Sequence, residues 1–469
     1  MAAMKAASLE PRRSRRTGPK RGAQGLALAR CIPESEQTGA KIGFASPSRR
    51  KVLGCGELLR DPGEGHIAVF APTGAGKSRN LLIPMLLSSD QPAIVLDVKG
   101  ELARTTARYR REALGHKTFV LDPWKVVTED PDSFNPLDIL SADDPGLPDD
   151  AYALARLLID EEGRSREAFW DESSQALIAG LIAYAVGTPK ENDRSFARVW
   201  EMLHGSDATY DLAVTLDTVK DIPPYAYAQI AGHLQVSADV TRSGIMAVVR
   251  QHMRLFGSPL VQQSVRNTSL DLDLICRGGA TTIYLVVPPS KLRSHAALLR
   301  LWLSALMTLF SQRNAAPEAQ TLLILDEVAQ LGRMEQVVQA VTLMRGFGVR
   351  CVLLLQSYAQ LKQLYPEEHE VFLENCGTLL TFGHTAFGMS KQMADALGDI
   401  SPEVLFRMER DQLALRLSGQ NTQIALRLDY LADPEFQGRF DHNPMYPPAP
   451  GTSGAPGIDG AARVRNRAN

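Results

Sequence analysis

The sequence contains no long hydrophobic run. Its longest apolar segment, residues 296–310, falls short of the roughly 20 residues that a membrane-spanning helix requires, and Arg300 interrupts it. We therefore expect a buried core helix there and no transmembrane helix in this chain. The basic first thirty residues are not followed by a hydrophobic segment, which argues against a secretory signal.

The sequence also has no excess of positive or negative charge, and its cysteines do not have the spacing of metal ligands. With 51 Lys and Arg against 53 Asp and Glu, the chain has no overall basic field that would attract nucleic acid, so any such surface must be local. The 5 cysteines are scattered, which fits a reducing compartment. They are Cys31, Cys55, Cys276, Cys351 and Cys376.

A glycine-rich segment, residues 71–78, reads Ala-Pro-Thr-Gly-Ala-Gly-Lys-Ser and directly follows the apolar run 66–70. A strand that leads through such a loop into a helix, here expected at 79–87, is typical of a loop that holds phosphate with its backbone N–H groups. Lys77 would reach the β- and γ-phosphates of ATP, and Ser78 would bind Mg²⁺. The expected nucleotide-binding residues are Pro72, Thr73, Gly74, Ala75, Gly76, Lys77, Ser78 and Arg79.

One residue departs from the usual pattern of these loops. Ala71 stands where they normally begin with glycine, and alanine is the least disruptive replacement. The alternative is a chance glycine-rich turn, which the strand before it and the acidic motif described below make the weaker interpretation.

Seven short apolar runs predict strands. Helix-compatible sequence lies between most of them, and each run is largely apolar, as in a parallel sheet that is buried on both faces. We therefore expect an α/β fold with a mostly parallel central sheet. The runs are residues 67–70, 93–96, 118–121, 281–287, 321–325, 349–355 and 378–382.

Between the third and fourth runs the periodicity is helical, with almost no strand-like sequence. We expect an all-helical domain inserted into a nucleotide-binding domain, between two disordered ends. The simplest interpretation of the basic N-terminal arm is a solvated segment, and the alternative is a contact with nucleic acid or anionic lipid. The expected divisions are the arm (1–41), the nucleotide-binding domain (42–140 and 271–440), the helical insert (141–270) and a Pro/Gly/Ala-rich tail (441–469).

Two adjacent acids end the apolar run 321–325. Ligands of nucleotide-binding sheets collect at the carboxyl ends of the strands, so Asp326 would hold Mg²⁺, directly or through water. Glu327 would orient or deprotonate the attacking water. Taken alone, the two acids fit an acidic strand-to-loop turn equally well. The phosphate-binding loop favours the catalytic interpretation.

Gln356 and Arg345 are two further catalytic candidates. Gln356 ends the run 349–355, where its amide can bond both the γ-phosphate and the attacking water. Arg345 precedes the same run and is placed to stabilise the transition state in a neighbouring subunit, or else it is a solvated arginine at a helix end. Asp97 follows the run 93–96 and either borders the nucleotide or caps the next helix.

Together these motifs resemble the conjugative coupling proteins, the TraG/VirD family of type IV secretion ATPases. The resemblance covers roughly residues 60 to 430. Beyond the phosphate-binding loop and the acidic pair, it rests on segments that are more specific to this family. They are residues 97–101 (Asp-Val-Lys-Gly-Glu), 121–123 (Leu-Asp-Pro), 134–137 (Phe-Asn-Pro-Leu), 325–332 (Leu-Asp-Glu-Val-Ala-Gln-Leu-Gly) and 360–365 (Gln-Leu-Lys-Gln-Leu-Tyr).

The resemblance implies a RecA-like P-loop NTPase with an inserted all-helical domain, assembled as a homo-hexamer. Such a protein would use ATP and Mg²⁺ to recruit DNA–relaxase or other protein substrates and to drive them into a type IV secretion channel. Lys77, Glu327 and Gln356 would then be catalytic, with Arg345 acting in trans. The helical block would contact substrate or relaxosome proteins.

Family members typically begin with transmembrane helices. The resemblance therefore leaves three interpretations open, namely a separate membrane anchor, a soluble variant and a remnant. We expect a cytoplasmic protein, with peripheral attachment to the bacterial inner membrane through such an anchor as the alternative.

Two other functions fit the same residues. One is a soluble ATPase that translocates single- or double-stranded DNA without any link to secretion. The other is a recruitment platform that binds ATP without hydrolysing it. Such a platform needs no water-activating carboxylate, so the acidic pair favours the two hydrolysing alternatives.

Overall fold

The computed structural model describes residues 25–32, 56–61, 63, 65–159, 168–188, 194–384 and 386–444. Within these residues, eleven strands form one sheet in the order β2-β1-β11-β10-β9-β3-β8-β7-β4-β6-β5. The strands are β1 (Leu26–Arg30), β2 (Leu58–Asp61), β3 (Ile67–Phe70), β4 (Ala93–Asp97), β5 (Lys117–Leu121), β6 (Thr281–Val286), β7 (Thr321–Leu325), β8 (Val349–Leu355), β9 (Thr378–Phe382), β10 (Gln412–Arg416) and β11 (Gln423–Leu426).

The seven strands from β9 to β5 are all parallel, and they are the seven runs predicted from the sequence. The predicted α/β fold with a mostly parallel sheet is confirmed. Phe70 at the end of β3 pairs with Leu355 of β8 on one side and with Thr381 of β9 on the other. This register brings the carboxyl ends of the three strands to the same edge of the sheet.

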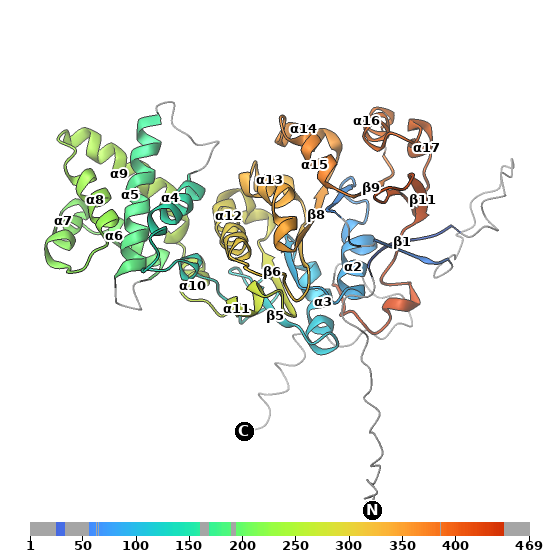
Figure 1. Cartoon of the computed structure of the whole chain (residues 1–469), viewed down its shortest axis with the longest axis horizontal. Helices are drawn as coiled ribbons and strands as arrows, with labels where there is room; N and C mark the ends of the chain where they lie inside the picture. The colour runs from blue at the N-terminus through green and yellow to red at the C-terminus, as the bar shows by residue number, and fades with distance from the viewer. Residues whose placement is uncertain are drawn as a thin grey trace, which may run out of the picture.

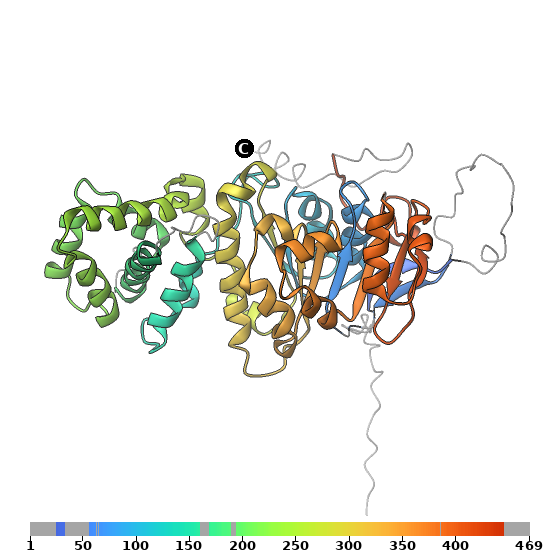
Figure 2. The same cartoon turned by 90° about the horizontal axis from the view of Figure 1, so that it is seen from above.

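Helices cover both faces of the sheet (Figures 1 and 2). Alternate strand residues face opposite cores, as the pleat requires: Val69 packs with one set of helices and Phe70 with the other. One face carries η1 (Ser78–Leu82), α2 (Ile83–Ser88) and α3 (Glu101–Glu112). The other carries α12 (Pro289–Ser311), η6 (Val328–Leu331), α13 (Glu335–Thr342), η7 (Met344–Phe347), α14 (Tyr358–Leu364), α15 (His369–Asn375), α16 (Phe387–Leu397) and α17 (Pro402–Phe406).

Residues 141–270 form helices and loops in their described part, and they lie to one side of the sheet (Figure 1). The two connections to the sheet run side by side, because Phe134 donates its N–H to Ser264 and Thr268 bonds Asp138. The helices here are η2 (Pro136–Ile139), α4 (Leu147–Leu158), α5 (Ala168–Gly187), α6 (Phe196–Leu203), α7 (Ala208–Thr218), α8 (Pro224–Leu234), α9 (Asp239–Met253), η5 (Arg254–Gly257) and α10 (Pro259–Ser264), after which α11 (Leu272–Cys276) leads back to β6.

Two predictions of disorder are wrong in part. Leu26–Arg30, within the expected arm 1–41, is the buried strand β1, which pairs with β2 and β11. Residues 441–444, within the expected tail, follow η8 (Pro434–Phe436) and lie against α3, where Arg108 Nε donates to Asp441 Oδ1 at 2.6 Å. Both segments are ordered by partners distant in sequence, which local composition does not reveal. The rest of the expected tail and most of the arm lie outside the described residues.

The described helices include none that combines the length and the apolar character needed to cross a bilayer. The longest apolar segment of the sequence is part of α12, which is packed between the sheet and α4. The expectation of a buried core helix there is confirmed.

Candidate active site

The phosphate-binding loop joins β3 to η1 at the carboxyl edge of the sheet. Its tight path depends on glycine at two positions, because Gly74 and Gly76 have φ values of 78° and 88°. A Cβ atom on Gly76 would lie 2.2 Å from Oδ1 of Asn80. Ala71 is fully buried and donates its N–H to Leu355 of β8 at 2.9 Å, so alanine is accommodated where glycine is usual.

Three of the predicted catalytic side chains meet in this structure. The ammonium group of Lys77 donates to Oε1 of Glu327 at 2.7 Å, and Nε2 of Gln356 donates to Oε2 of the same carboxylate at 3.0 Å. Lys77 follows β3, Glu327 follows β7 and Gln356 follows β8. Since β8 lies between β3 and β7, the parallel register alone brings the three residues together.

Glu327 has an unusual backbone conformation. Its φ and ψ are 59° and 52°, in the left-handed region that a residue with a Cβ rarely adopts. Such strain costs about 1–3 kcal/mol and is concentrated at functional sites. Burial favours the neutral acid, but the hydrogen bonds from Lys77 and Gln356 outweigh burial and hold the pKa of Glu327 below its usual value. The carboxylate is therefore charged at neutral pH.

Asp326 is the residue that best fits a metal ligand. It is buried, and its Oδ1 atom has no hydrogen-bond partner among the described residues. Burial first, and then the charges of Glu327 and Glu101, raise its pKa to about 6, while Lys77 lowers it. A nearby cation would satisfy the orphaned oxygen and favour the charged form.

The chemistry of the other donors is consistent with Mg²⁺. Magnesium is usually held by one or two carboxylates together with water and substrate phosphates, and the described residues contain no closed cluster of His, Cys, Asp and Glu that would form a complete metal cage. The hydroxyl of Ser78, at the first position of η1, is the second predicted ligand.

Asp97 lies beside this site but has a structural role as well. Its Oδ2 atom accepts the backbone N–H of Ala103 at 2.8 Å, so it holds the start of α3. Burial raises the pKa of Asp97 to about 7, against the effect of that hydrogen bond, and the charge of Asp326 adds to the increase. Asp97 thus caps α3, as one of the two interpretations predicted, and it lies next to the predicted metal site.

The sequence did not reveal a second contact to the phosphate-binding loop. Segment 427–429, which follows β11, holds the loop through three side-chain contacts, and we call this segment the clasp. Nη1 of Arg427 donates to the carbonyl of Ala75 at 2.8 Å, and Asn80 Nδ2 donates to the carbonyl of Leu428 at 2.6 Å. Arg79, predicted to bind nucleotide, forms a bidentate pair with Asp429 at 2.8 and 2.5 Å. No local motif marks residues 427–429.

Arg345 is not part of this constellation. It lies in η7, before β8, and its exposed side chain is close enough to His66, before β3, to contribute to lowering the pKa of that histidine. Both residues are therefore at the amino edge of the sheet, whereas Lys77 and Glu327 are at the carboxyl edge. Arg345 does not complete the site of its own chain, and its predicted action in trans stays a prediction.

A family model places the chain among known proteins. The model described as "Type IV secretory system Conjugative DNA transfer" matches residues 32–437. This range includes the phosphate-binding loop, the helical insert, the acidic pair and the clasp.

Sequence relatives come from the same group of proteins. The conjugal transfer protein TraG of Escherichia coli is 25% identical over 65% of this chain and 50% of its own length. The protein VirD4 of Agrobacterium fabrum (strain C58) is 27% identical over 73% of this chain and 51% of its own length. The chain thus spans about half the length of these curated relatives.

The fold also matches solved structures of the plasmid coupling protein TrwB. A structure in complex with ADP and Mg²⁺ aligns with a TM-score of 0.58 and 14% identity, over 87% of this chain and 95% of that one. A structure in complex with a non-hydrolysable ATP analogue gives a TM-score of 0.59 and 14% identity, over 87% and 94%. The resemblance predicted from the sequence is confirmed, and the chain belongs to the type IV secretory system conjugative DNA transfer family.

Proposed function

We propose that this chain is an ATP-hydrolysing coupling protein that recruits DNA–relaxase or protein substrates and drives them into a type IV secretion channel. The observation that carries the proposal is the meeting of Lys77, Glu327 and Gln356 at the carboxyl edge of the sheet. A platform that only binds ATP has no use for a strained, charged carboxylate next to the loop lysine. The geometry therefore favours hydrolysis.

Lys77, Glu327 and Gln356 would each have a different role in ATP hydrolysis. Lys77 would exchange its contact with Glu327 for the β- and γ-phosphates, because a triphosphate offers it a larger negative charge. Glu327, released from the lysine, would orient the attacking water and accept its proton. Gln356 already contacts Glu327, so its amide is placed to respond to the γ-phosphate and to transmit its loss to α14.

Asp326 and Ser78 are the residues that would hold Mg²⁺. The bound ion would neutralise charge on the β- and γ-phosphate oxygens. The raised pKa of Asp326 fits this role, because a carboxylate that is costly to ionise alone becomes stable beside a cation.

We further propose that the active form is a homo-hexamer in which Arg345 of one subunit reaches the nucleotide of the next. Two facts support this. The side chain of Arg345 is exposed, and it lies at the edge of the sheet opposite to its own phosphate-binding loop. We therefore assign Arg345 to the nucleotide site of a neighbouring copy in such a ring. Attachment to the inner membrane through a separate anchor belongs to the same proposal.

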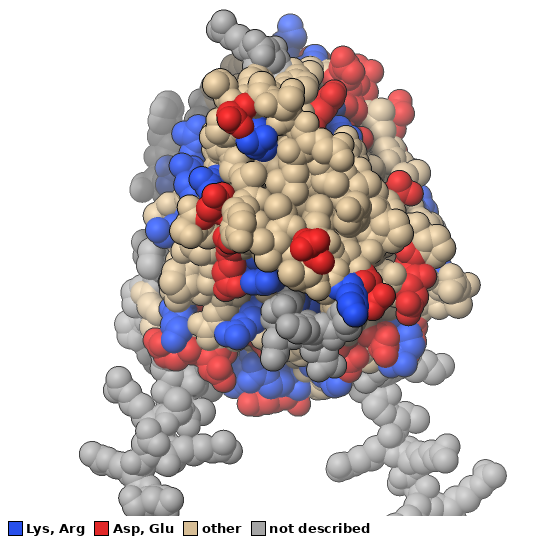
Figure 3. Space-filling view, turned by 90° about the vertical axis from the view of Figure 1, so that its left-hand side faces the viewer, with Lys and Arg blue, Asp and Glu red and all other residues tan. Residues whose placement is uncertain are grey.

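The outer end of the helical insert is the surface that we assign to protein substrates. Figure 3 looks onto this end and shows a broad area with few charged side chains, bordered by charged residues. Large apolar side chains are exposed on α7, α8 and α9 of this domain, and they offer apolar surface to a partner. They are Tyr210, Val214, Tyr227 and Val240.

The test is the rate of ATP hydrolysis by the full chain with and without single-stranded DNA. Hydrolysis that increases with DNA supports a translocating motor. ATP binding without hydrolysis under either condition would identify a recruitment platform instead. A motor unconnected with secretion is distinguished by a pull-down against purified relaxase and channel components, because only a coupling protein should retain them.

A further inference from the structure

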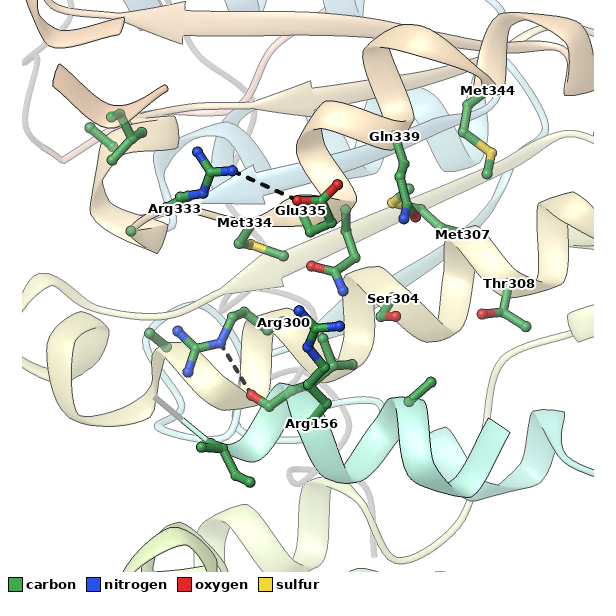
Figure 4. A pocket seen from close by; sticks show the side chains of 18 of the residues that line it. Arg156, Arg300, Ser304, Met307, Thr308, Arg333, Met334, Glu335, Gln339 and Met344 are labelled. Carbon is green, nitrogen blue, oxygen red and sulfur yellow. Dashed lines mark hydrogen bonds and ion pairs between the residues drawn. The ribbon is translucent and has the colours of Figure 1, made fainter. Parts of the chain in front are cut away.

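A groove separates the helical insert from the domain that carries the active site. It has a volume of about 1050 Å³, and its walls are α4 on one side and α12, the segment after η6 and α13 on the other. Figure 4 shows Arg156 and Arg300 directed into this space, with Arg333 and Gln339 on the opposite wall. The groove does not include Lys77, Glu327 or Gln356, so it is distinct from the nucleotide site.

The charges of the groove favour an anionic ligand. Four arginines line it, Arg156, Arg293, Arg300 and Arg333, against two acids, Asp149 and Glu335. Arg333 is already paired with Glu368, with N···O distances of 3.1 and 2.7 Å. Arg156 and Arg293, in contrast, make no side-chain ion pair or hydrogen bond within the described residues. These two cations are available to a ligand.

The rest of the lining is suited to bases. Tyr152 on α4 is 43% exposed, so one face of its ring can receive a stacked base. Gln336, Gln339 and Gln363 supply amide groups that both donate and accept hydrogen bonds. Separated arginines, an exposed aromatic ring and neutral amides are the features by which proteins hold single strands. The volume exceeds the roughly 300–1,000 Å³ of small-ligand pockets only slightly, which suits a few nucleotides rather than a duplex.

The groove is also connected to the catalytic carboxylate. Ala329 and residues 332–336 line its wall, and they follow Glu327 directly in the chain. This stretch is bounded by two residues with positive φ, Glu327 at 59° and Gly332 at 71°. A ligand that contacts residues 332–336 can therefore shift the segment that sets the strained conformation of Glu327.

From these observations we propose that the groove between α4, α12 and α13 binds single-stranded nucleic acid, and that its occupation stimulates hydrolysis through the segment 327–334. The binding part of the proposal stands on the groove alone, whereas the stimulation part rests on the proposed ATPase activity. Phosphates would lie on Arg156 and Arg293, with a base on Tyr152.

The experiment measures binding of a fluorescent oligothymidylate of about 20 nucleotides to the full chain by anisotropy. The test variant combines Arg156→Gln with Arg293→Gln. We expect its affinity to fall about tenfold or more. Each phosphate contact with a single strand contributes about 0.7 to the slope of log K against log salt, so losing two should make the slope shallower by about 1.4.

Three further variants make this result specific. Arg111→Gln with Arg407→Gln removes the same charge from exposed positions outside the groove and should leave binding unchanged. Arg156→Lys with Arg293→Lys keeps the charge and should retain most of the affinity. Tyr152→Ala should weaken binding by about tenfold, with no change in the salt slope.

Hydrolysis is then measured on the same proteins. The strand should stimulate the wild type and the control pair, but not the Arg156→Gln, Arg293→Gln pair, whose rate without DNA should be normal. Lys77→Ala should bind the oligonucleotide although it does not hydrolyse ATP. Wild-type protein that binds the strand but does not hydrolyse ATP would contradict the proposed ATPase activity and leave the groove assignment intact.

Several outcomes would overturn the proposal. The proposed site is wrong if the wild-type protein does not bind the strand at low salt. It is also wrong if the Arg156→Gln, Arg293→Gln variant binds as well as the wild type. Displacement of the strand by polyglutamate at equal or lower charge concentration would assign the groove to an acidic protein segment. Loss of binding with undiminished stimulation would show that the stimulating strand binds elsewhere.

Discussion

Nζ of Lys77 lies 2.7 Å from Oε1 of Glu327, so the lysine that we propose to bind phosphate and the carboxylate that we propose to activate water neutralise each other in this structure. Both side chains are at least partly shielded from solvent, which strengthens the pair relative to an exposed one. ATP would have to break this contact to bind productively. On the proposed mechanism, the pair would keep the carboxylate from activating water until a triphosphate is present.

Replacing Glu327 should separate binding from hydrolysis. We expect Glu327→Gln to bind ATP and to hydrolyse it at least about a hundredfold more slowly, because the amide cannot accept the proton of the attacking water. Lys77→Ala should instead weaken ATP binding itself. Nucleotide titration and steady-state hydrolysis measure the two effects, with Glu374→Gln on the exposed face of α15 as control. A normal rate for Glu327→Gln would show that another group activates the water.

Arg345 should act between subunits. Rings of Arg345→Ala alone and of Glu327→Gln alone should both hydrolyse ATP slowly. A mixture should regain activity, because some sites then combine an intact carboxylate with an intact arginine from the neighbour. The rate is measured across mixing ratios, with Arg407→Ala in place of Arg345→Ala as control. Absence of rescue would return Arg345 to the role of a solvated arginine.

The clasp should determine the affinity for nucleotide. Arg427→Gln removes the hydrogen bond to the carbonyl of Ala75 and the contact of the guanidinium with the ring of Phe382, 4.2 Å from its centroid. Burial lowers the pKa of Arg427 to about 10, but the group remains charged at neutral pH.

We expect this change to raise the KM for ATP about tenfold through a less ordered loop, with a smaller effect on kcat. Steady-state kinetics give both constants, and Arg111→Gln on the exposed face of α3 is the control. A decrease in kcat at unchanged KM would instead indicate direct participation of Arg427 in the chemical step.

Asp97 should make stability depend on pH. Its pKa is about 7 in the folded chain and 3.8 ordinarily, so between these values the native state keeps a proton that the unfolded chain has lost. The stability that this proton supplies is present below about pH 4 and is lost as the pH rises through about 7. Asp97→Asn can still accept the N–H of Ala103 but has no charge to bury.

We therefore expect the free energy of unfolding of Asp97→Asn, relative to the wild type, to increase by about 1–4 kcal/mol between pH 4 and pH 8. Urea unfolding at the two pH values measures it. The exposed Asp130→Asn should show no such trend. A relative stability that does not change with pH would mean that Asp97 is ionised at little cost in the native protein.

Local sequence was sufficient to predict those elements that have a distinctive pattern of their own residues. Each run of the central sheet, such as 67–70 or 321–325, is largely apolar, which is typical of a strand that is buried on both faces. Lys77 was predictable from the glycine-rich loop after such a strand, and Glu327 and Gln356 from their positions at the ends of two others.

The antiparallel part of the sheet was not predictable in this way. Leu26–Arg30 consists of leucine, alanine and arginine, which favour helix, and it becomes a strand because β2 and β11 pair with it. β10 and β11 were likewise missed, and with them Arg427 and Asp429, whose contacts to the phosphate-binding loop join residues about 350 positions apart.

The sequence by itself determined the parallel sheet, the phosphate-binding loop and the identity of the groups at its edge, because periodicity and short motifs are local properties. Only the tertiary structure decided what those groups contact. It paired Lys77 with Glu327, left Oδ1 of Asp326 without a partner in the described part of the chain, placed Arg345 at the opposite edge and opened an arginine-lined groove beside the helical insert. These relations depend on strand order and on the packing of distant segments, which no stretch of sequence encodes alone.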